Sequence, residues 1–164
     1  MILIDTSGLI AAADGSDPRH SEVVAALAKE VPPFLISPFV LAEVDYLALT
    51  RWGVERELAL LDEVARGAFQ LAPFDAADLE VAQKLIARYE DQEIGLADAS
   101  IVVLAHRHRT RRVLTLDHRH FRVLRGPGGK PFTILPGDWN EERRVRHTGT
   151  LEASAAECNM YGII

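Results

Sequence analysis

The sequence predicts an α/β protein with three layers, in which a central, mostly parallel sheet is flanked by helices. Short apolar segments alternate with longer segments of helical period over residues 1–136, and this alternation is typical of parallel strands joined by right-handed crossovers. The first apolar segment, Ile2-Leu3-Ile4, has no polar residue between its members, so both faces of that strand should be covered. A length of 164 residues with 48% hydrophobic residues suits one domain with a sizeable core.

Caps, turns and periodicity set the order of the elements. After the strand at 2–4, Asp17-Pro18 begins a helix that ends before Pro32. Ser37-Pro38 is a typical N-cap and first helical position, and Gly53 closes that helix. In order, we expect strands at 2–4, 34–36, within 69–74, at 113–116 and at 132–135, the last at a sheet edge, with helices at 17–30, 38–51, 54–66, 75–89 and 96–110.

Residues 1–140 are expected to form the domain, and residues 141–164 a separate tail. Glu141 to Arg146 is a charge run, and Thr148 to Ile164 shows neither apolar period nor helix caps. We expect this tail to be disordered or foreign to the natural chain.

Composition excludes several classes of protein. No apolar stretch approaches the roughly 20 residues of a membrane helix, and the start lacks a signal peptide. The lone Cys158 permits no internal disulfide, which agrees with a reducing compartment. We therefore expect a cytoplasmic protein with no membrane partner.

Two acids follow apolar strands, Asp5 after Ile4 and Asp117 after Leu116. In a parallel sheet both would lie at the carboxyl edge, where such folds bind their ligands. Asp98 lies in the first turn of the helix at 96–110, on the face that carries Ile101 and Val102, and should be partly desolvated. The alternative is that each acid merely caps or complements a helix start.

The helix at 38–51 holds two further acids that periodicity does not separate. Glu43 shares a face with Val40 and Leu47, whereas Asp45 shares one with Leu41 and Leu49. Either side chain is compatible with the inward direction. The residues alone therefore leave the fourth acid undecided.

Three or four carboxylates in one crevice cannot all remain ionised without a cation. With no cysteine pair and no histidine pair at zinc spacing, oxygen ligands favour Mg²⁺ or Mn²⁺. Ions held in this way promote phosphodiester hydrolysis.

The net charge of −6 argues against a nucleic-acid partner, but the charge is unevenly distributed. Residues 106–130 contain eight Lys and Arg with Asp117 as their only acid. Such a run is often only a solvated face. Beside a metal site, we expect it to hold a polyanion.

Four motifs resemble the PIN domain of VapC-type toxins, in order over residues 1–136. They are Leu3-Ile4-Asp5-Thr6-Ser7, then Ser37-Pro38 with Leu41-Ala42-Glu43, then Ile94-Gly95-Leu96-Ala97-Asp98-Ala99-Ser100, and finally Leu114-Thr115-Leu116-Asp117 with His120-Phe121. Each motif is weak alone, and the four together are specific.

The resemblance implies a metal-dependent endoribonuclease, the toxin of a type II toxin–antitoxin pair. By this resemblance Asp5 and Asp98 are the principal Mg²⁺ or Mn²⁺ ligands, and Glu43 rather than Asp45 supports them together with Asp117. Thr6 or Ser7 would hydrogen-bond a ligand carboxylate or the attacking water. The candidate RNA-binding residues are Arg107, Arg111, Arg112, Arg119 and His120.

Partners and substrate also follow from the resemblance. A VapB-like antitoxin would block the site, and a homodimer is expected. The apolar stripe of the helix at 54–66, with the helix at 38–51, is the expected antitoxin groove. Relatives cut tRNA or the sarcin–ricin loop of 23S rRNA, and the segments at 89–98 and 110–121 look more like the rRNA-cutting branch.

Other classes fit the residues less well. A haloacid-dehalogenase-like phosphatase would carry a second acid at the position of Ser7, and a receiver domain would carry acids before Asp5. The remaining alternatives are an RNA-processing nuclease without antitoxin and a non-catalytic module that binds a regulatory partner.

Overall fold

The computed structural model describes residues 1–138. Strands and helices alternate along this part of the chain, as the apolar pattern predicts. The strands are β1 (Ile2–Ile4), β2 (Phe34–Ile36), β3 (Gln70–Leu71), β4 (Arg112–Leu114) and β5 (Thr133–Leu135). The helices are α1 (Thr6–Ala13), α2 (His20–Leu27), α3 (Pro38–Trp52), α4 (Val54–Ala65), α5 (Ala76–Arg88), α6 (Leu96–His108) and α7 (His118–Val123), with the 3-10 helices η1 (Glu90–Gln92) and η2 (Pro127–Gly129).

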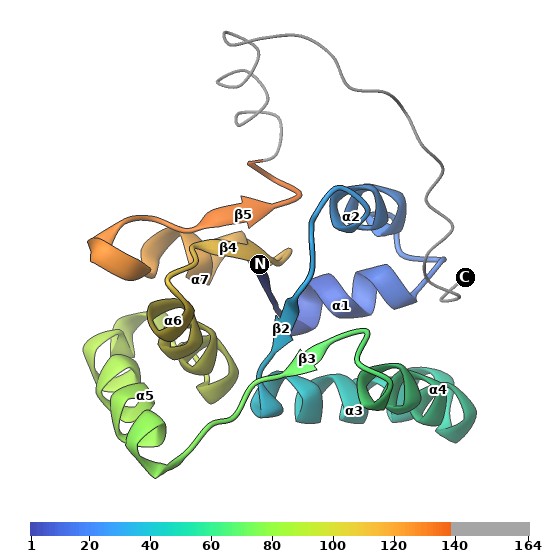
Figure 1. Cartoon of the computed structure of the whole chain (residues 1–164), viewed down its shortest axis with the longest axis horizontal. Coiled ribbons are helices and arrows are strands. Elements are labelled where there is room, and N and C mark those ends of the chain that lie inside the picture. Colours follow the sequence, from blue (N-terminus) through green and yellow to red (C-terminus); the bar gives the residue numbers. More distant parts are fainter. Residues whose placement is uncertain (139–164) are drawn as a thin grey trace, which may run out of the picture.

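The five strands form one sheet in the order β3-β2-β1-β4-β5, and every neighbouring pair is parallel. Figure 1 shows α1 to α4 on one side of this sheet and α5 and α6 on the other. The predicted three-layer α/β fold is therefore confirmed, with β5 at an edge as expected.

The first strand of the chain is the central strand of the sheet. Ile4 pairs with Ile36 of β2 and with Leu114 of β4. All three residues of β1 are buried, which explains why the sequence shows an unbroken apolar run there. The order of strands reverses direction beside β1, so the crevice expected of such sheets opens at the carboxyl ends of β1 and β4.

Three short helices depart from the sequence-based prediction. Helix α1 starts directly after β1, where the prediction had placed its first helix only from residue 17, and α2 begins three residues later than expected. Helix α7 has the polar sequence HRHFRV and was not predicted. Gly8 lets α1 pass close to β4, because a Cβ at Gly8 would lie 2.5 Å from the Leu114 carbonyl oxygen.

The core fills both sides of the sheet and holds α6 in the middle of the fold. Eight of the nine residues of α6 from Ala97 to Ala105 are buried. In the described part of the chain, no helix is long and apolar enough to cross a membrane. The tail expected at 141–164 lies outside the described residues.

Candidate metal centre

The predicted acids come from three elements that meet at the carboxyl edge of the sheet. Asp5 directly follows β1, Asp117 lies three residues after the last residue of β4, and Asp98 is in the first turn of α6. Burial raises the pKa of Asp98, and the nearby carboxylates of Asp5 and Asp117 raise it further, while the Gly95 backbone N–H and His120 act to lower it. The charges of these three acids are thus close enough to interact.

Asp5 is buried and is held by two hydroxyl groups. The Ser7 hydroxyl donates to Asp5 Oδ2 over 2.6 Å, and the Thr115 hydroxyl donates to the same oxygen over 2.7 Å. Within residues 1–138, no hydrogen bond reaches the other oxygen, Oδ1. One carboxylate oxygen is therefore fixed by the protein, and the other is available to a ligand.

Asp5 also caps α1, so the two interpretations of the opening acid are compatible. Its side chain accepts from the Ser7 backbone N–H over 3.4 Å, a long contact. Asp117 behaves in the same way at α7, where it accepts from the His120 backbone N–H over 3.0 Å. Both acids thus begin a helix while their carboxylates face the same edge.

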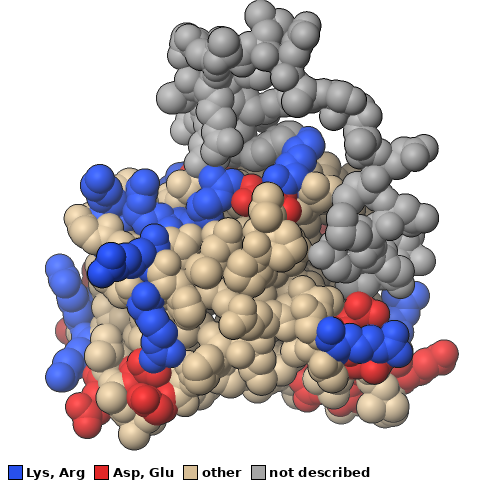
Figure 2. Space-filling view, in the orientation of Figure 1, with Lys and Arg blue, Asp and Glu red and all other residues tan. Residues whose placement is uncertain are grey.

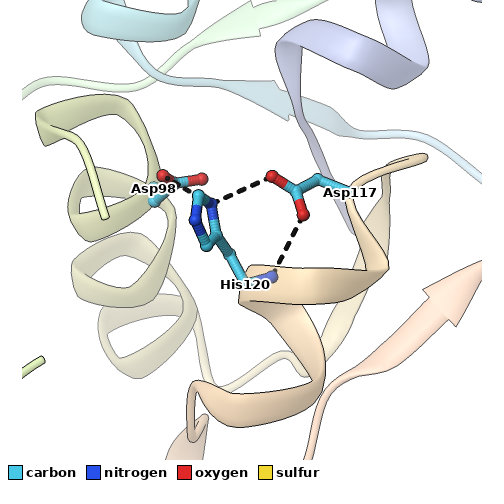
Figure 3. A group of neighbouring side chains, drawn as sticks. All are labelled: Asp98, Asp117 and His120. Atoms are coloured by element: carbon cyan, nitrogen blue, oxygen red, sulfur yellow. Dashed lines mark hydrogen bonds and ion pairs between the residues drawn. The ribbon is translucent and has the colours of Figure 1, made fainter. Parts of the chain in front are cut away.

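Asp98, Asp117 and His120 form a compact cluster (Figure 3). One possible ligand atom from each side chain lies within 4.8 Å of the others. His120 Nδ1 lies 2.9 Å from Asp117 Oδ2 and 3.3 Å from Asp98 Oδ2. Two carboxylates and one imidazole at this spacing suit a divalent cation.

The helix start of α6 supports the Asp98 carboxylate. The Gly95 backbone N–H donates to Asp98 Oδ2 over 3.0 Å, as expected for an acid near a helix N-terminus. The helix therefore offsets part of the cost of burying a negative charge, and it fixes the direction of the side chain.

Glu43 and Asp45 point to different partners. The Thr6 hydroxyl donates to Glu43 Oε2 over 2.7 Å, which links Glu43 to the residue next to Asp5. Asp45 instead shares a hydrogen bond with Glu57 of α4, and this contact helps to raise the pKa of Glu57, after burial. The local contacts thus connect Glu43, and not Asp45, to the strand end that carries Asp5.

The predicted RNA-binding residues are scattered rather than gathered. Arg107 pairs with Asp78 of α5, and Arg112, at the amino end of β4, pairs with Glu30. Arg111 donates to the Pro131 carbonyl oxygen over 3.1 Å. Arg119 lies on α7 beside the cluster, 3.6 Å from Glu93, and its side chain is exposed.

Basic side chains nevertheless collect on one part of the surface. Figure 2 shows Lys and Arg gathered over the region of α7 and β5, with acidic side chains mainly along the lower edge of the same face. The net negative charge of the chain thus coexists with a locally basic area on this face.

Sequence reasoning missed two residues of this site. Thr115 follows β4 and binds Asp5, and the hydroxyl between Leu114 and Leu116 was the available signal. His120 was assigned to RNA binding, and oxygen ligands alone were expected at the metal. In the structure its ring lies between Asp98 and Asp117, with both ring nitrogens shielded from solvent.

Comparisons with known proteins agree with this fold. The PIN domain family matches residues 2–126. Over 135 residues, the chain is 49% identical to Ribonuclease VapC26 of Mycobacterium tuberculosis, covering 82% of this chain and 100% of that protein.

Solved structures share the fold at lower sequence identity. VapC20 of Mycobacterium tuberculosis, described as a sarcin–ricin loop cleaving toxin, has a TM-score of 0.68 at 22% identity over 73% of this chain and 92% of its own. A toxin–antitoxin complex from Klebsiella pneumoniae has a TM-score of 0.60 at 24% identity over 76% and 92%. VapBC2 of Rickettsia felis, bound to promoter DNA, has a TM-score of 0.59 at 21% identity over 82% and 98%. From the matched domain and the close VapC relative, the chain belongs to the PIN-domain family and, within it, to the VapC group.

Proposed function

We propose that this protein is a metal-dependent endoribonuclease and the toxin of a type II toxin–antitoxin pair. The observation that carries the proposal is the meeting of Asp5, Asp98 and Asp117 at one edge of the sheet, where their charges interact. The 49% identity to a protein named as a ribonuclease supports the same activity. Within residues 1–138, the one group of three possible ligand side chains whose atoms lie within 4.8 Å of one another is Asp98, Asp117 and His120, which includes two of these acids.

Each acid has a separate role in this proposal. Asp5 and Asp98 are the principal ligands of Mg²⁺ or Mn²⁺, and Glu43 and Asp117 support them. Ser7 holds Asp5 by a hydrogen bond of 2.6 Å, and Thr6 holds Glu43 by one of 2.7 Å. The hydroxyls thereby fix the carboxylates before a ligand arrives, which lowers the cost of ordering the site.

The donor set fits a divalent ion. Oxygen Oδ1 of Asp5 has no hydrogen bond within the described residues, and the His120 ring nitrogens have none either. When bound, such an ion would clamp the phosphoryl oxygens and lower the pKa of the attacking water. The protein's own part is to hold the carboxylates in place and to align the RNA backbone beside them.

Arg119 is the best placed of the proposed RNA-binding residues. It is exposed on α7, the helix that also carries His120, and its ion pair with Glu93 is long and open to solvent. Arg107, Arg111 and Arg112 remain proposed contacts for outlying parts of the RNA. Their protein partners are Asp78, the Pro131 carbonyl oxygen and Glu30.

We propose a structured RNA as the substrate, either the sarcin–ricin loop of 23S rRNA or a tRNA. A single-stranded loop exposes its bases and its phosphates together, which suits cleavage beside scattered Arg side chains. The structural neighbour VapC20 is described as cleaving the sarcin–ricin loop. An RNA substrate and a lone cysteine both agree with the cytoplasm.

A VapB-like antitoxin is the proposed inhibitor, with a homodimer as the proposed form of the toxin. Structural neighbours include toxin–antitoxin complexes. Helices α3 and α4 expose several apolar side chains, namely Tyr46, Leu49, Val54 and Leu58. An amphipathic antitoxin helix would cover this surface.

RNA cleavage by matched acid variants tests the proposed activity. Asp5→Asn and Asp98→Asn should each lower cleavage with Mg²⁺ or Mn²⁺ by about 100-fold or more, because a ligand charge is lost. Asp62→Asn is the control, since Asp62 forms only an exposed pair with Arg66 on α4. Unchanged cleavage by both site variants would show that the metal site is wrongly assigned.

The toxin role needs a separate test. Expression of the wild-type chain should arrest bacterial growth, and co-expression of a short antitoxin-like protein from the neighbouring gene should restore it. Cleavage in vitro with no such inhibition would favour an RNA-processing nuclease without antitoxin. Mapping the cut sites on purified ribosomes and on tRNA separates the two proposed substrates.

A further inference from the structure

We propose that His120 is itself a ligand of the metal ion, so that the site combines carboxylate oxygens with one imidazole nitrogen. This inference rests on the proposed function only in that the acids hold a divalent ion. It adds a residue that the acidic motifs do not contain, and it predicts which ions the site prefers.

The position of the ring is the first argument. Figure 3 shows the His120 side chain between Asp98 and Asp117, reaching from α7 toward the start of α6. Its Nδ1 atom lies 3.3 Å from Asp98 Oδ2 and 2.9 Å from Asp117 Oδ2. The nitrogen is thus close to both carboxylates at once, as ligands around a common ion are.

The missing hydrogen bonds are the second argument. Neither ring nitrogen of His120 makes a hydrogen bond of suitable direction to any described residue, although both are shielded from solvent. The distances from Nδ1 to the two carboxylates are short, but neither oxygen lies in line with the ring N–H. Buried polar atoms normally have a partner, and a bound ion would provide one for Nδ1.

The ring is also well fixed. Asp117 caps α7 through the His120 backbone N–H, so the residue that supplies one carboxylate also positions the imidazole. The next residue, Phe121, is fully buried and packs edge-on against Phe132 with ring centroids 5.6 Å apart. Helix α7 is therefore anchored to the core, and His120 is held in place before any ion binds.

An imidazole ligand changes the choice of ion. Carboxylates and water suit Mg²⁺, whereas imidazole nitrogen favours transition-metal ions. The site should therefore bind Mn²⁺ more tightly than Mg²⁺, and His120 should account for the difference.

Electron paramagnetic resonance of the full chain loaded with Mn²⁺ tests the ligand directly. The affinity tag must be removed and the buffer must contain no nitrogen donor. Spin-echo measurements should show hyperfine coupling between Mn²⁺ and a directly bound nitrogen in the wild-type protein. The coupling should vanish in His120→Ala and in His120→Gln.

His118 provides the matched control. It lies on the same helix two residues away. Its ring lies beside Gly137, where an added Cβ would be 2.5 Å from the ring atom Cε1, and not between Asp98 and Asp117. His118→Asn should keep the nitrogen coupling and bind Mn²⁺ as the wild type does. Loss of the signal in this variant as well would overturn the assignment to His120.

Ion affinities give a second readout that is independent of RNA cleavage. His120→Ala should weaken Mn²⁺ binding by about 10- to 100-fold and Mg²⁺ binding by less, because Mg²⁺ gains little from an imidazole ligand. Thermal unfolding in EDTA should show that the variant is folded before any affinity is compared.

The outcomes separate this inference from the proposed function. In one outcome, the wild type binds Mn²⁺ without nitrogen coupling, and Asp98→Asn no longer binds it. This outcome would overturn the role of His120 and leave the nuclease proposal intact. Equal losses of Mn²⁺ and Mg²⁺ affinity in His120→Ala would also overturn it. If the wild type bound neither ion, both proposals would fail.

Discussion

Thr115 and Asp5 join the two central strands of the sheet through one hydrogen bond. The Thr115 hydroxyl donates to Asp5 Oδ2 over 2.7 Å, and its oxygen accepts from the Asp117 backbone N–H over 2.9 Å. Each residue lies just beyond the paired positions Ile4 and Leu114. A single buried hydroxyl therefore connects two of the proposed metal-binding acids.

Thr115→Val removes this hydroxyl while keeping the shape of the side chain. The Asp117 N–H would lose its partner and Asp5 would lose one of its donors, so the free energy of unfolding should fall by about 1–3 kcal/mol. Urea denaturation measures the loss. Thr115→Ser keeps the hydroxyl and should bind Mn²⁺ as the wild type does, whereas a Val variant with unchanged Mn²⁺ affinity would contradict the positioning role.

Glu43 and Asp45 form a matched pair of acids on α3. Glu43→Gln should reduce RNA cleavage by about 10-fold or more, because its carboxylate supports the ion and accepts from Thr6. Asp45→Asn should leave cleavage unchanged, since Asp45 contacts Glu57 of α4. Initial rates with saturating Mg²⁺ compare the two, and a larger loss in the Asp45 variant would reverse the assignment.

The raised pKa of Asp98 makes stability depend on pH when metal is removed. The ordinary pKa of this group is 3.8, and burial with the neighbouring acids raises it in the folded state. Between these two pKa values, the folded protein holds a proton that the unfolded chain has released. The stability that this proton contributes is fully present below pH 3.8 and is lost as pH rises through the folded pKa.

Asp98→Asn should therefore be more stable than the wild type at pH 7 in EDTA, and the two should converge in acid. Urea unfolding at several pH values measures the difference. Saturating Mn²⁺ should reverse the order, because ligand at 100 times its Kd adds about 2.7 kcal/mol to a protein that binds it. A variant that gains the same stability from Mn²⁺ would contradict the ligand role of Asp98.

Leu58 tests the antitoxin surface. Its side chain is 59% exposed on α4, so Leu58→Lys should leave the fold intact while placing a charge under the antitoxin helix. Affinity for the antitoxin should fall by at least about fivefold, or about 1 kcal/mol. Val81→Lys is the control, since Val81 is similarly exposed at 48% on α5; titration calorimetry with purified antitoxin compares the two.

Arg119 and Arg112 should differ in how they affect RNA binding. Arg119→Gln should weaken binding and reduce the salt slope by about 0.7, the loss of one phosphate contact on single-stranded RNA. Arg112→Gln should weaken RNA binding less, because Arg112 already pairs with Glu30, and it should also lower stability by about 2 kcal/mol, because it leaves the mostly buried Glu30 without its charged partner. Binding isotherms at several salt concentrations, with urea denaturation, distinguish these effects.

Much of the fold could be predicted because strands that are buried on both faces have apolar sequences. The strand at 34–36 agrees at both ends, and Asp5 and Asp117 were placed at one edge by the rule for parallel sheets. Helix α1 was missed because it spans only eight residues and begins with Thr6, Ser7 and Gly8, which are poor helix formers. Helix α7 was missed because most of its side chains are polar and it spans only six residues.

The site could be predicted only as far as strand ends and helix starts determine it. Glu43 and Asp45 both have apolar neighbours at helical spacing, and only the contact with Thr6 distinguishes Glu43. His120 lies in a basic run, so composition suggested an open surface. Its position among acids depends on how α7 packs beside α6, which no local pattern records.

The central place of β1 has a consequence for synthesis on the ribosome. Of the described strands, β1 is made first, yet it needs partners on both sides, and Thr115 reaches Asp5 across 110 positions of sequence. A nascent chain that ends before β4 has neither Asp117 nor Thr115, which supplies one of the two hydroxyls that hold Asp5. The growing polypeptide therefore cannot bring Asp5, Asp98 and Asp117 together until nearly the whole domain has been made.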